Sequence, residues 1–278
     1  MYKLTDIKPI QLNDLVRIGK QQDGGYVITR RQLEKTDILL SFGISADWSF
    51  DNDFLHKARA ERRGVSLYAY DYSVSANILR KHIIKALFFA MYKFATFDFK
   101  TAKERVAFAV EKMIHPFPCF FNPAKNRYFF KKYLGNHDND EYISVDTVFS
   151  THLKPQVKDL SVFVKMDIEE SEYRTLPAFK PFYRLINGFA IEFHNLDILG
   201  NNFTEIVREM SEYFYVAHVH ANNYGGYIYP SMLPKTLEIT FINKKLIPEP
   251  PVNSTYSYPV HGLDFPCNPK IPEIPIMF

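Results

Sequence analysis

Short apolar runs alternate with longer stretches of mixed polarity between residue 37 and about residue 245. The runs are rich in β-branched and aromatic side chains, which is typical of buried strands. Strands that alternate with helical stretches predict an α/β domain with a mostly parallel sheet. The expected strands are 37–42, 65–70, 142–146, 161–166, 188–193, 214–220 and 236–242. We expect the final strand to run antiparallel, returning after the loop that follows the strand before it.

A helix is predicted between the first two strands, with Ser49 as its N-cap and Gly64 just past its end. Asp51 and Asp53 lie near its start, where the helix dipole favours negative charge. Three apolar residues share one face at helical spacing: Phe50, Phe54 and Ala58. Residues 37–70 are therefore expected to form a βαβ unit.

We expect a single domain with three parts: an N-terminal cap (1–36), a core (37–245) and a C-terminal strap (246–278). The strap is rich in proline, which excludes regular secondary structure, but it keeps aromatic residues that a free linker would lack. Within the core, residues 76–115 predict a helical insertion. Its apolar stretch, within 80–96, carries lysines, so a buried helix, a dimer element and a helix on a membrane surface all stay open.

Composition narrows the class of protein. The 278 residues carry 34 basic and 31 acidic side chains, a net charge of +3 that argues against a nucleic-acid partner. Two distant cysteines and the absence of a signal-like N-terminus predict a reducing, cytoplasmic location, with contact to the inner face of the membrane left open. No apolar run approaches the roughly 20 residues that cross a bilayer, so we expect a soluble protein.

The turn after the first strand, SFGISADWSF, resembles a nucleotide-binding loop that has kept one glycine, Gly43. A pyrophosphate needs the G-x-G-x-x-G spacing, because the backbone must approach the phosphates closely. Here Ser45, Ala46 and Asp47 replace the later glycines, and Asp47 would repel phosphate. S-adenosylmethionine carries no phosphate and bears a sulfonium cation, so the loop disfavours a dinucleotide more than it disfavours this cofactor.

The second strand ends in Asp71. A carboxylate at this edge accepts hydrogen bonds from the ribose hydroxyls of an adenosine in dinucleotide folds. The alternative is that Asp71 is the N-cap of the next helix.

Acidic residues gather after the strand at 161–166. Asp167 and Glu169 are interpreted as site residues, whereas Glu170 and Glu172 are interpreted as the acidic start of a helix. So many carboxylates repel one another unless a sulfonium, a divalent metal or a cationic substrate lies among them.

The next strand ends in Glu192 and His194. Neighbouring parallel strands end at the same edge of a sheet, so Asp167, Glu192 and His194 are expected to converge there. If a metal binds, we expect Asp167 and Glu192 to hold it. Further along, His218 and His220 share one face of a strand, where they line the site, lie in the core or bind zinc.

Motifs along the chain resemble the FkbM-type family of S-adenosylmethionine-dependent methyltransferases, in particular a methyltransferase-like branch. The matching segments are DGGYVI (23–28), SFGISADWSF (41–50), YAYD (68–71), VKMDIEESEY (164–173), IEFHNLD (191–197), HVHANNYGG (218–226) and LDFPCNP (263–269). The resemblance implies a Rossmann-like class I methyltransferase fold, S-adenosylmethionine as cofactor and methyl transfer to oxygen. The family that the chain resembles includes enzymes that modify bacterial polysaccharides and natural products.

Position by position, the resemblance implies that Asp71 holds the ribose and that Asp167 lies beside the methionine end or the sulfonium. Asp47 faces the cofactor or starts the helix. One departure stands out, since Glu170 occupies a position where the family has glycine. Two further groups of residues are implied to shape the cofactor loop and to fold back over the site: Phe42, Gly43 and Ile44, and Asp23, Gly24, Gly25 and Tyr26.

The expected reaction needs a base for the acceptor hydroxyl, and His194 or His220 is expected to take the proton while Glu192 orients the acceptor or the histidine. A Mg²⁺ ion on Asp167 and Glu192 would be an alternative way to acidify the hydroxyl. The expected acceptor is a sugar, a sugar nucleotide or a glycan of a bacterial surface polysaccharide such as a capsule. Two other classes stay open: an NAD-dependent oxidoreductase, and a non-catalytic protein that binds glycans or a membrane surface.

Overall fold

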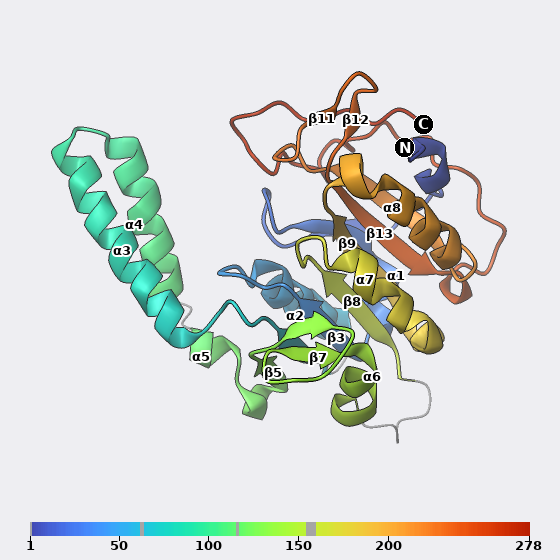
Figure 1. The fold of residues 1–278 in the computed structure, drawn as a ribbon, viewed down its shortest axis with the longest axis horizontal. Coiled ribbons are helices and arrows are strands. Elements are labelled where there is room, and N and C mark those ends of the chain that lie inside the picture. Colours follow the sequence, from blue (N-terminus) through green and yellow to red (C-terminus); the bar gives the residue numbers. More distant parts are fainter. Residues whose placement is uncertain (1, 62–63, 115–116, 154–159) are drawn as a thin grey trace.

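The computed structural model describes residues 2–61, 64–114, 117–153 and 160–278, and its centre is a seven-stranded sheet (Figure 1). The strand order is β10-β13-β9-β8-β3-β4-β5, in which β13 is antiparallel to both of its neighbours and the pairs from β9 to β5 are parallel. The bounds are β3 Ile38–Phe42, β4 Ser66–Tyr70, β5 Arg127–Phe130, β8 Val162–Met166, β9 Ile186–Phe193, β10 Phe214–Ala221 and β13 Leu237–Asn243. This arrangement confirms the predicted Rossmann-like fold with one antiparallel strand.

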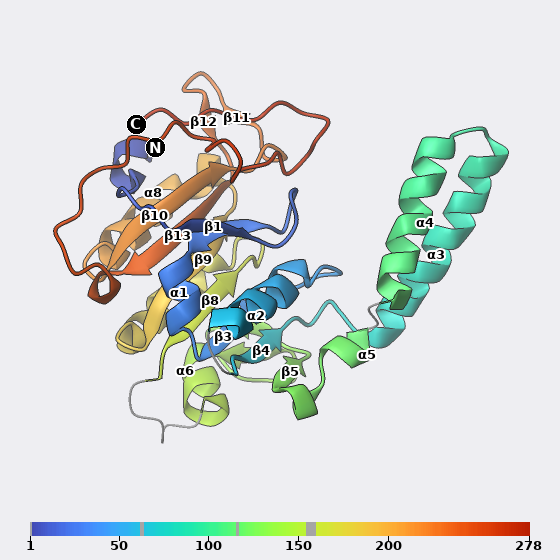
Figure 2. The same ribbon diagram turned by 180° about the vertical axis from the view of Figure 1, so that it is seen from behind.

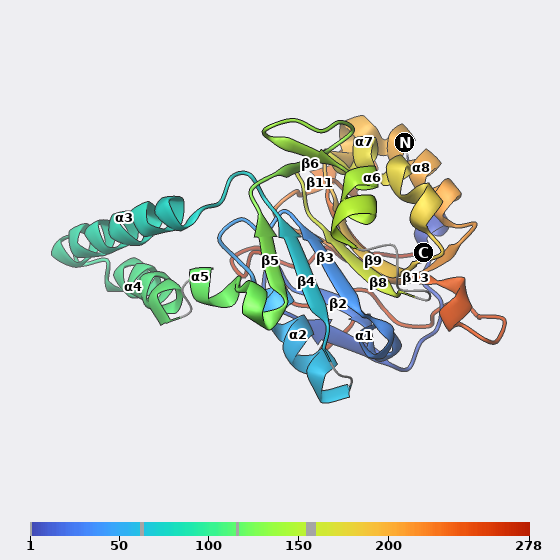
Figure 3. The same cartoon turned by 90° about the horizontal axis from the view of Figure 1, so that it is seen from below.

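Helices cover both faces of the sheet (Figure 3). On one face lie α1 (Arg30–Lys35) and α2 (Ser49–Glu61), and on the other lie α6 (Val145–Thr147), α7 (Glu172–Thr175) and α8 (Leu196–Met210). The central strands are buried on both sides, which explains their unbroken apolar runs.

Alternate side chains of one strand enter different cores: Leu39 packs with Phe54 of α2, while Leu40 belongs to the cluster that contains Phe203 of α8. Short 3₁₀ or π helices lie at Leu4–Ile7, Pro123–Lys125, Val148–His152, Leu176–Phe182 and Lys244–Leu246.

The N-terminal cap contains a hairpin that the sequence pattern did not predict, formed by β1 (Leu15–Ile18) and β2 (Tyr26–Thr29). The hairpin lies over the antiparallel end of the sheet, where Thr240 Oγ1 of β13 donates to the Val27 carbonyl at 2.6 Å. Its turn thereby comes close to the carboxyl edge of the sheet.

Two local predictions were wrong. Residues 142–146 do not enter the central sheet, because β7 (Tyr142–Ser144) pairs with β6 (Tyr133–Gly135) in a separate two-stranded ribbon, and β5 takes the place beside β4. Ser49 is not the N-cap of α2 but its first residue. Asp47 caps this turn instead, since its Oδ1 accepts from the Ser49 backbone N–H at 2.9 Å, while Ser49 Oγ is buried without a partner.

The insertion forms a helical hairpin that projects away from the body of the domain (Figures 1 and 2). It consists of α3 (Ala76–Ala95) and α4 (Phe99–Ile114), and the short α5 (Phe117–Phe120) lies at its base. There Trp48 contacts Phe117 and Phe120 at ring-centroid distances of 5.8 and 6.1 Å. None of the helices in the described ranges is long and apolar enough to cross a membrane.

The C-terminal strap runs along the sheet without forming regular secondary structure of any length. It forms single bridges at Asn253 with Ile10 and at Tyr258 with Ile276. A small ribbon of β11 (Tyr227–Ile228) and β12 (Leu233–Pro234) lies beside it, at the same end of the domain as both termini (Figure 1).

Candidate active site

The loop after β3 requires its single glycine. Gly43 has a φ of +72°, and a Cβ at this position would lie 1.5 Å from the Asp167 carbonyl oxygen at the end of β8. The buried Lys165 side chain donates to the Gly43 carbonyl. Any larger residue would therefore force the ends of β3 and β8 apart.

Asp71 fixes the same loop from the neighbouring strand. Its Oδ2 accepts the backbone N–H groups of Ile44 at 2.9 Å and Ser45 at 2.7 Å, while its Oδ1 accepts from the Ser73 amide and hydroxyl. Asp71 is not the N-cap of α3, because Ser75 holds that position and accepts from the Ile78 amide. The two loop amides that could face a phosphate are thus already bonded to a carboxylate.

A cavity of about 490 Å³ opens beside this loop, between the ends of β3, β4 and β8 and the β6–β7 ribbon. Its size falls in the usual range for small-molecule sites, roughly 300–1,000 Å³. Three predicted cofactor residues, Gly43, Asp71 and Asp167, line the cavity. Three tyrosines, Tyr70, Tyr133 and Tyr142, also form part of its wall. The remaining lining residues are Ser45, Ser73, Leu134, Ile168, Glu169 and Ser171. The cavity combines carboxylates with aromatic rings.

The other predicted cofactor residues support the cavity or lie beyond it. Phe42 and Ile44 are buried, and the Phe42 ring stacks on Tyr70 at 5.1 Å. Asp47 starts α2 and forms an ion pair with Lys20 at 3.0 Å.

The turn between β1 and β2 is tightly fitted. A Cβ on Gly25 would lie 2.0 Å from the Lys20 carbonyl oxygen, and Tyr26 is buried. Asp23 lies in this turn, at the solvent-exposed border of a group of buried carboxylates.

These carboxylates form a row across the antiparallel end of the sheet, where His220 of β10 pairs with Glu238 of β13 and Glu238 pairs with Glu192 of β9. The carboxylate of Asp23 lies close to those of both glutamates. Partial burial and the charges of Glu238 and Asp167 raise the pKa of Asp23 to about 6.

Glu192 is almost fully buried and accepts from Asn222 Nδ2 at 2.6 Å and, more weakly, from the Tyr26 hydroxyl at 3.4 Å. Burial, together with the charges of Asp167 and Glu238, raises the pKa of Glu192 well above its usual value. Burial and the neighbouring carboxylates thus favour the neutral form of Glu192, and a cation bound nearby would oppose this effect.

His194 lies between this row and Asp167, which lines the cavity. Its Nδ1 is 3.0 Å from Glu172 Oε1, and its Nε2 lies 3.6 Å from Glu192 Oε1 and 3.8 Å from Asp167 Oδ1. Burial alone would lower the pKa of His194, but the hydrogen bond to Glu172 and the charges of Glu192, Glu172 and Asp167 raise it to about 9. The structure thus confirms the predicted convergence of Asp167, Glu192 and His194.

Glu172 does begin α7, as predicted, but it is more than a helix start. Its side chain is fully buried, and the oxygen that meets His194 also accepts the Ile168 amide at 3.2 Å. The other oxygen, Oε2, is buried without a partner. Glu172 is therefore the group that orients His194.

The turn after Asp167 keeps the conformation of a glycine without having one. Glu169 and Glu170 have φ values of +51° and +73°, in the left-handed region, and Asn195 has +50°. The Asn195 side-chain amide donates to the Glu170 carboxylate across the turn. This hydrogen bond links two residues in the left-handed conformation, one of which is the glutamate that replaces the expected glycine.

The two histidines of β10 lie on one face, as predicted, but with different partners. His218 Nε2 is 3.1 Å from Asp264 Oδ2 of the strap. His220 Nδ1 is 2.9 Å from Glu238 Oε2, and its Nε2 is 3.2 Å from Glu273 Oε2. Burial alone would lower the pKa of His220, but these two hydrogen bonds raise it to about 10.

Several site residues escaped the sequence analysis. Glu238 lies near the start of a strand, whereas the predicted site residues lie at strand ends, and Asn222 was noted only within the segment HVHANNYGG. Within the described ranges, three sets of side chains bring potential metal ligands within 4.8 Å of one another: Asp167, Glu192 and His194; Asp23, Glu192 and Glu238; His220, Glu238 and Cys267.

A scan against protein-family models gives no match for this chain, and a search of curated proteins gives none either. Solved structures do match, among them the crystal structure of a precorrin-6y C5,15-methyltransferase from Geobacter metallireducens GS-15. The two chains are 10% identical, and the alignment covers 77% of this chain and 87% of that one with a TM-score of 0.30. A likeness this distant carries no conclusion about activity. The fold therefore rests on the strand order, and the FkbM-type resemblance stays a prediction.

Proposed function

We propose that this protein is an S-adenosylmethionine-dependent methyltransferase. The observation that carries the proposal is the state of the first loop, whose Ile44 and Ser45 amides are bonded to Asp71 instead of facing the cavity. Asp71, Asp167 and Glu169 border the same cavity. A negative wall without free loop amides suits an adenosine that bears a sulfonium cation and disfavours a pyrophosphate, so an NAD-dependent oxidoreductase is the weaker hypothesis.

Calorimetric titration shows which of the two cofactors binds and tests whether the negative charge of the cavity wall contributes to binding. We expect S-adenosylmethionine to bind more tightly than S-adenosylhomocysteine, because only the former carries the positive charge, and NAD⁺ not to bind. In Asp167→Asn this preference should shrink at least threefold, whereas Asp146→Asn, an exposed aspartate of α6, should leave it unchanged. Tighter binding of NAD⁺ than of S-adenosylmethionine would overturn the proposal.

The acceptor is proposed to be a hydroxyl group, deprotonated by His194. When bound, S-adenosylmethionine supplies an electrophilic methyl group for direct displacement, which leaves the protein to align the acceptor and remove its proton. The carboxylates that raise the pKa of His194 include Asp167, so a cation held there would lower that pKa and free the imidazole to act as a base. His220 is less suited, because both of its nitrogens are engaged by carboxylates.

A carbohydrate is the proposed acceptor class, as a free sugar, a sugar nucleotide or a glycan of a bacterial surface polysaccharide. The support is the polar surroundings of Glu192, which lies 3.6 Å from His194: Asn222, Asp23 and the hydroxyl of Tyr26. Transfer of labelled methyl groups to a panel of sugar nucleotides and polysaccharides tests the proposal. Loss of transfer in His194→Gln but not in His56→Gln, an exposed histidine of α2, would support the role of His194.

A metal-assisted version of the same reaction has one observation in its favour. The ligand atoms of Asp167, Glu192 and His194 lie within 4.8 Å of one another, and a divalent ion such as Mg²⁺ could acidify the hydroxyl. Activity that is lost with a chelator and restored by Mg²⁺ would favour this version. No binding of S-adenosylmethionine or S-adenosylhomocysteine at millimolar concentration would instead favour a non-catalytic binding protein.

A further inference from the structure

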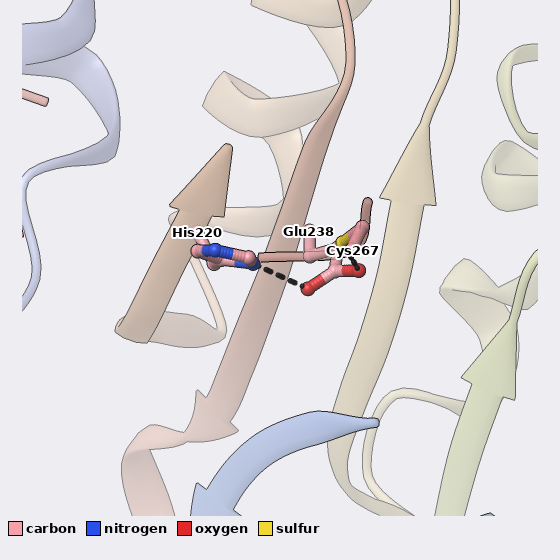
Figure 4. A group of neighbouring side chains, drawn as sticks. All are labelled: His220, Glu238 and Cys267. Carbon is pink, nitrogen blue, oxygen red and sulfur yellow. Dashed lines mark hydrogen bonds and ion pairs between the residues drawn. The ribbon is translucent and has the colours of Figure 1, made fainter. Parts of the chain in front are cut away.

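The buried cysteine of the strap meets two side chains of the sheet (Figure 4). Cys267 is 2% exposed, and its Sγ lies 3.3 Å from Glu238 Oε1. The second oxygen of Glu238 is 2.9 Å from His220 Nδ1. One sulfur, one nitrogen and one oxygen ligand, from the strap, β10 and β13, therefore lie within 4.8 Å of one another.

This ligand set matches the preferences of zinc, which binds thiolate, imidazole and carboxylate, usually in tetrahedral sites. A metal-bound histidine commonly donates its other ring N–H to a carboxylate, which fixes the orientation of the ring. His220 has that partner already, since its Nε2 lies 3.2 Å from Glu273 Oε2 on the strap. Asp23, whose carboxylate is close to that of Glu238, is a candidate for the fourth ligand, and water is the other.

We propose that Cys267, His220 and Glu238 bind one Zn²⁺ ion, which fastens the C-terminal strap to the antiparallel end of the sheet. The site shares no ligand with the neighbouring Asp167–Glu192–His194 group and does not depend on the methyltransferase proposal. The ion would displace one proton from the thiol and one from the imidazolium, so the net charge of the buried group would not change. Glu238 and Cys267 supply the further ligands beside His220, whereas His218 pairs with Asp264 and is not part of the site.

The test is metal content, with the second cysteine of the chain as the matched control. We expect protein purified from zinc-supplemented cells to contain about one zinc per chain by elemental analysis, as a single site requires. Cobalt substitution should give a thiolate-to-cobalt charge-transfer band. Both signals should be lost in Cys267→Ser, which keeps a hydroxyl beside Glu238, and be retained in Cys119→Ser, the exposed cysteine.

Zinc removal provides a readout that does not use enzyme activity. A chelator should lower the melting temperature of the wild type and of Cys119→Ser, and should leave Cys267→Ser unchanged. Less than a tenth of an equivalent of zinc in all three proteins, together with no cobalt–thiolate band, would overturn the proposal. Equal zinc content in Cys267→Ser and the wild type would also overturn it.

A second, independent inference concerns the α3–α4 hairpin, whose apolar pattern is inverted. The buried seam between its helices contains small residues, namely Ala86 and Ala90 of α3 and Ala102 and Ala109 of α4. Large apolar side chains point outward instead, with Phe97 at the turn 81% exposed. The others are Ile84, Leu87, Phe88, Phe89, Met91, Tyr92, Phe94, Phe99, Val106, Val110 and Met113. An exposed apolar surface of this extent marks a docking face.

The net charge of the hairpin indicates which kind of partner this apolar surface binds. Residues 76–114 hold eight basic and three acidic side chains, a net charge of +5, which leaves −2 on the rest of the chain. Two such hairpins would repel each other, whereas an anionic bilayer attracts lysines and accepts aromatic side chains at its interface. We infer that the hairpin docks on the surface of an anionic membrane with its aromatic turn inserted.

Vesicle sedimentation tests this inference. The protein should bind vesicles of phosphatidylcholine mixed with phosphatidylglycerol at least tenfold more tightly than vesicles of phosphatidylcholine alone. The triple variant Phe94→Ser, Phe97→Ser and Phe99→Ser should lose this binding, while Met277→Ser, which removes an equally exposed apolar side chain elsewhere, should keep it. A stable dimer that binds neither vesicle, or equal binding to both vesicles, would overturn the inference.

Discussion

The hydrogen bond between Glu172 and His194 allows a test in which one charge is removed and the geometry is kept. In Glu172→Gln the side-chain oxygen can still accept from Ile168 N and His194 Nδ1, and the new amide group takes the place of Oε2, which has no partner. A hydrogen bond to a neutral acceptor is weaker than one to a carboxylate by about 1–1.5 kcal/mol. That difference corresponds to about one pKa unit, so the pKa of His194 should fall from about 9 to about 8.

The destabilisation caused by Glu172→Gln is also expected to depend on pH. The pKa of His194 is higher in the folded protein than its value of 6.5 in an unfolded chain, so the bound proton stabilises the fold below pH 6.5. This contribution disappears as the pH rises through the folded-state pKa. Glu172→Gln should therefore lose about 1.4 kcal/mol more of its unfolding free energy, relative to the wild type, at pH 6 than at pH 10.

The assays are an NMR titration of the His194 ring and urea unfolding at both pH values. Glu170→Gln is the matched control, because Glu170 is an exposed glutamate two residues earlier that contacts Asn195 and not His194. The control should leave the His194 titration unchanged. If Glu172→Gln titrates at the wild-type pH, the assignment of Glu172 as the orienting group is refuted.

Three further substitutions test the loops. Gly43→Ala should destabilise the fold by more than about 3 kcal/mol in urea unfolding, because the new Cβ meets the Asp167 carbonyl in addition to the left-handed strain; stability within about 1 kcal/mol would contradict this. Asp71→Asn should weaken S-adenosylhomocysteine binding at least tenfold by calorimetry and cost about 2–3 kcal/mol, since one carboxamide cannot accept from both the Ile44 and the Ser73 amides; unchanged binding would refute the role of Asp71. Glu170→Gly should be about 1 kcal/mol more stable than Glu170→Ala by thermal unfolding, because only glycine adopts a φ of +73° freely; equal stability would contradict the strain.

The sequence predicts most of the sheet because its central strands are local, unbroken apolar runs. β5 was missed because four residues, RYFF, between polar neighbours give no period, and it acquires its strand conformation by pairing with β4. The β1–β2 hairpin was missed for a similar reason, since its packing against β13 is a long-range contact that local composition does not report.

The same distinction between local sequence signals and long-range contacts applies to the site. Asp167, Glu192 and His194 were predictable together, because the ends of neighbouring parallel strands share an edge. Glu238 and Cys267 were not, since their positions depend on the antiparallel register of β13 and on the path of the strap. Glu172 shows the limit most clearly: an acid at a helix start looks like a simple charge effect until its complete burial is known.

Because β13 runs antiparallel to β10, the loop between Ala221 and Leu237 can vary in length at its tip without disturbing the sheet. The two residues pair with each other, so the loop leaves and re-enters the sheet at the same edge, beside the acidic row. A connection between two parallel strands must instead cross from one end of the sheet to the other. A change in the length of such a connection therefore shifts the helix within it. Asn222 and Asn223 hold the start of the 221–237 loop against Glu192 and the strap, but its exposed tip around Tyr229 can be lengthened without moving a strand. Under the proposed function, changing the tip of this loop is the most direct route to altering the choice of acceptor.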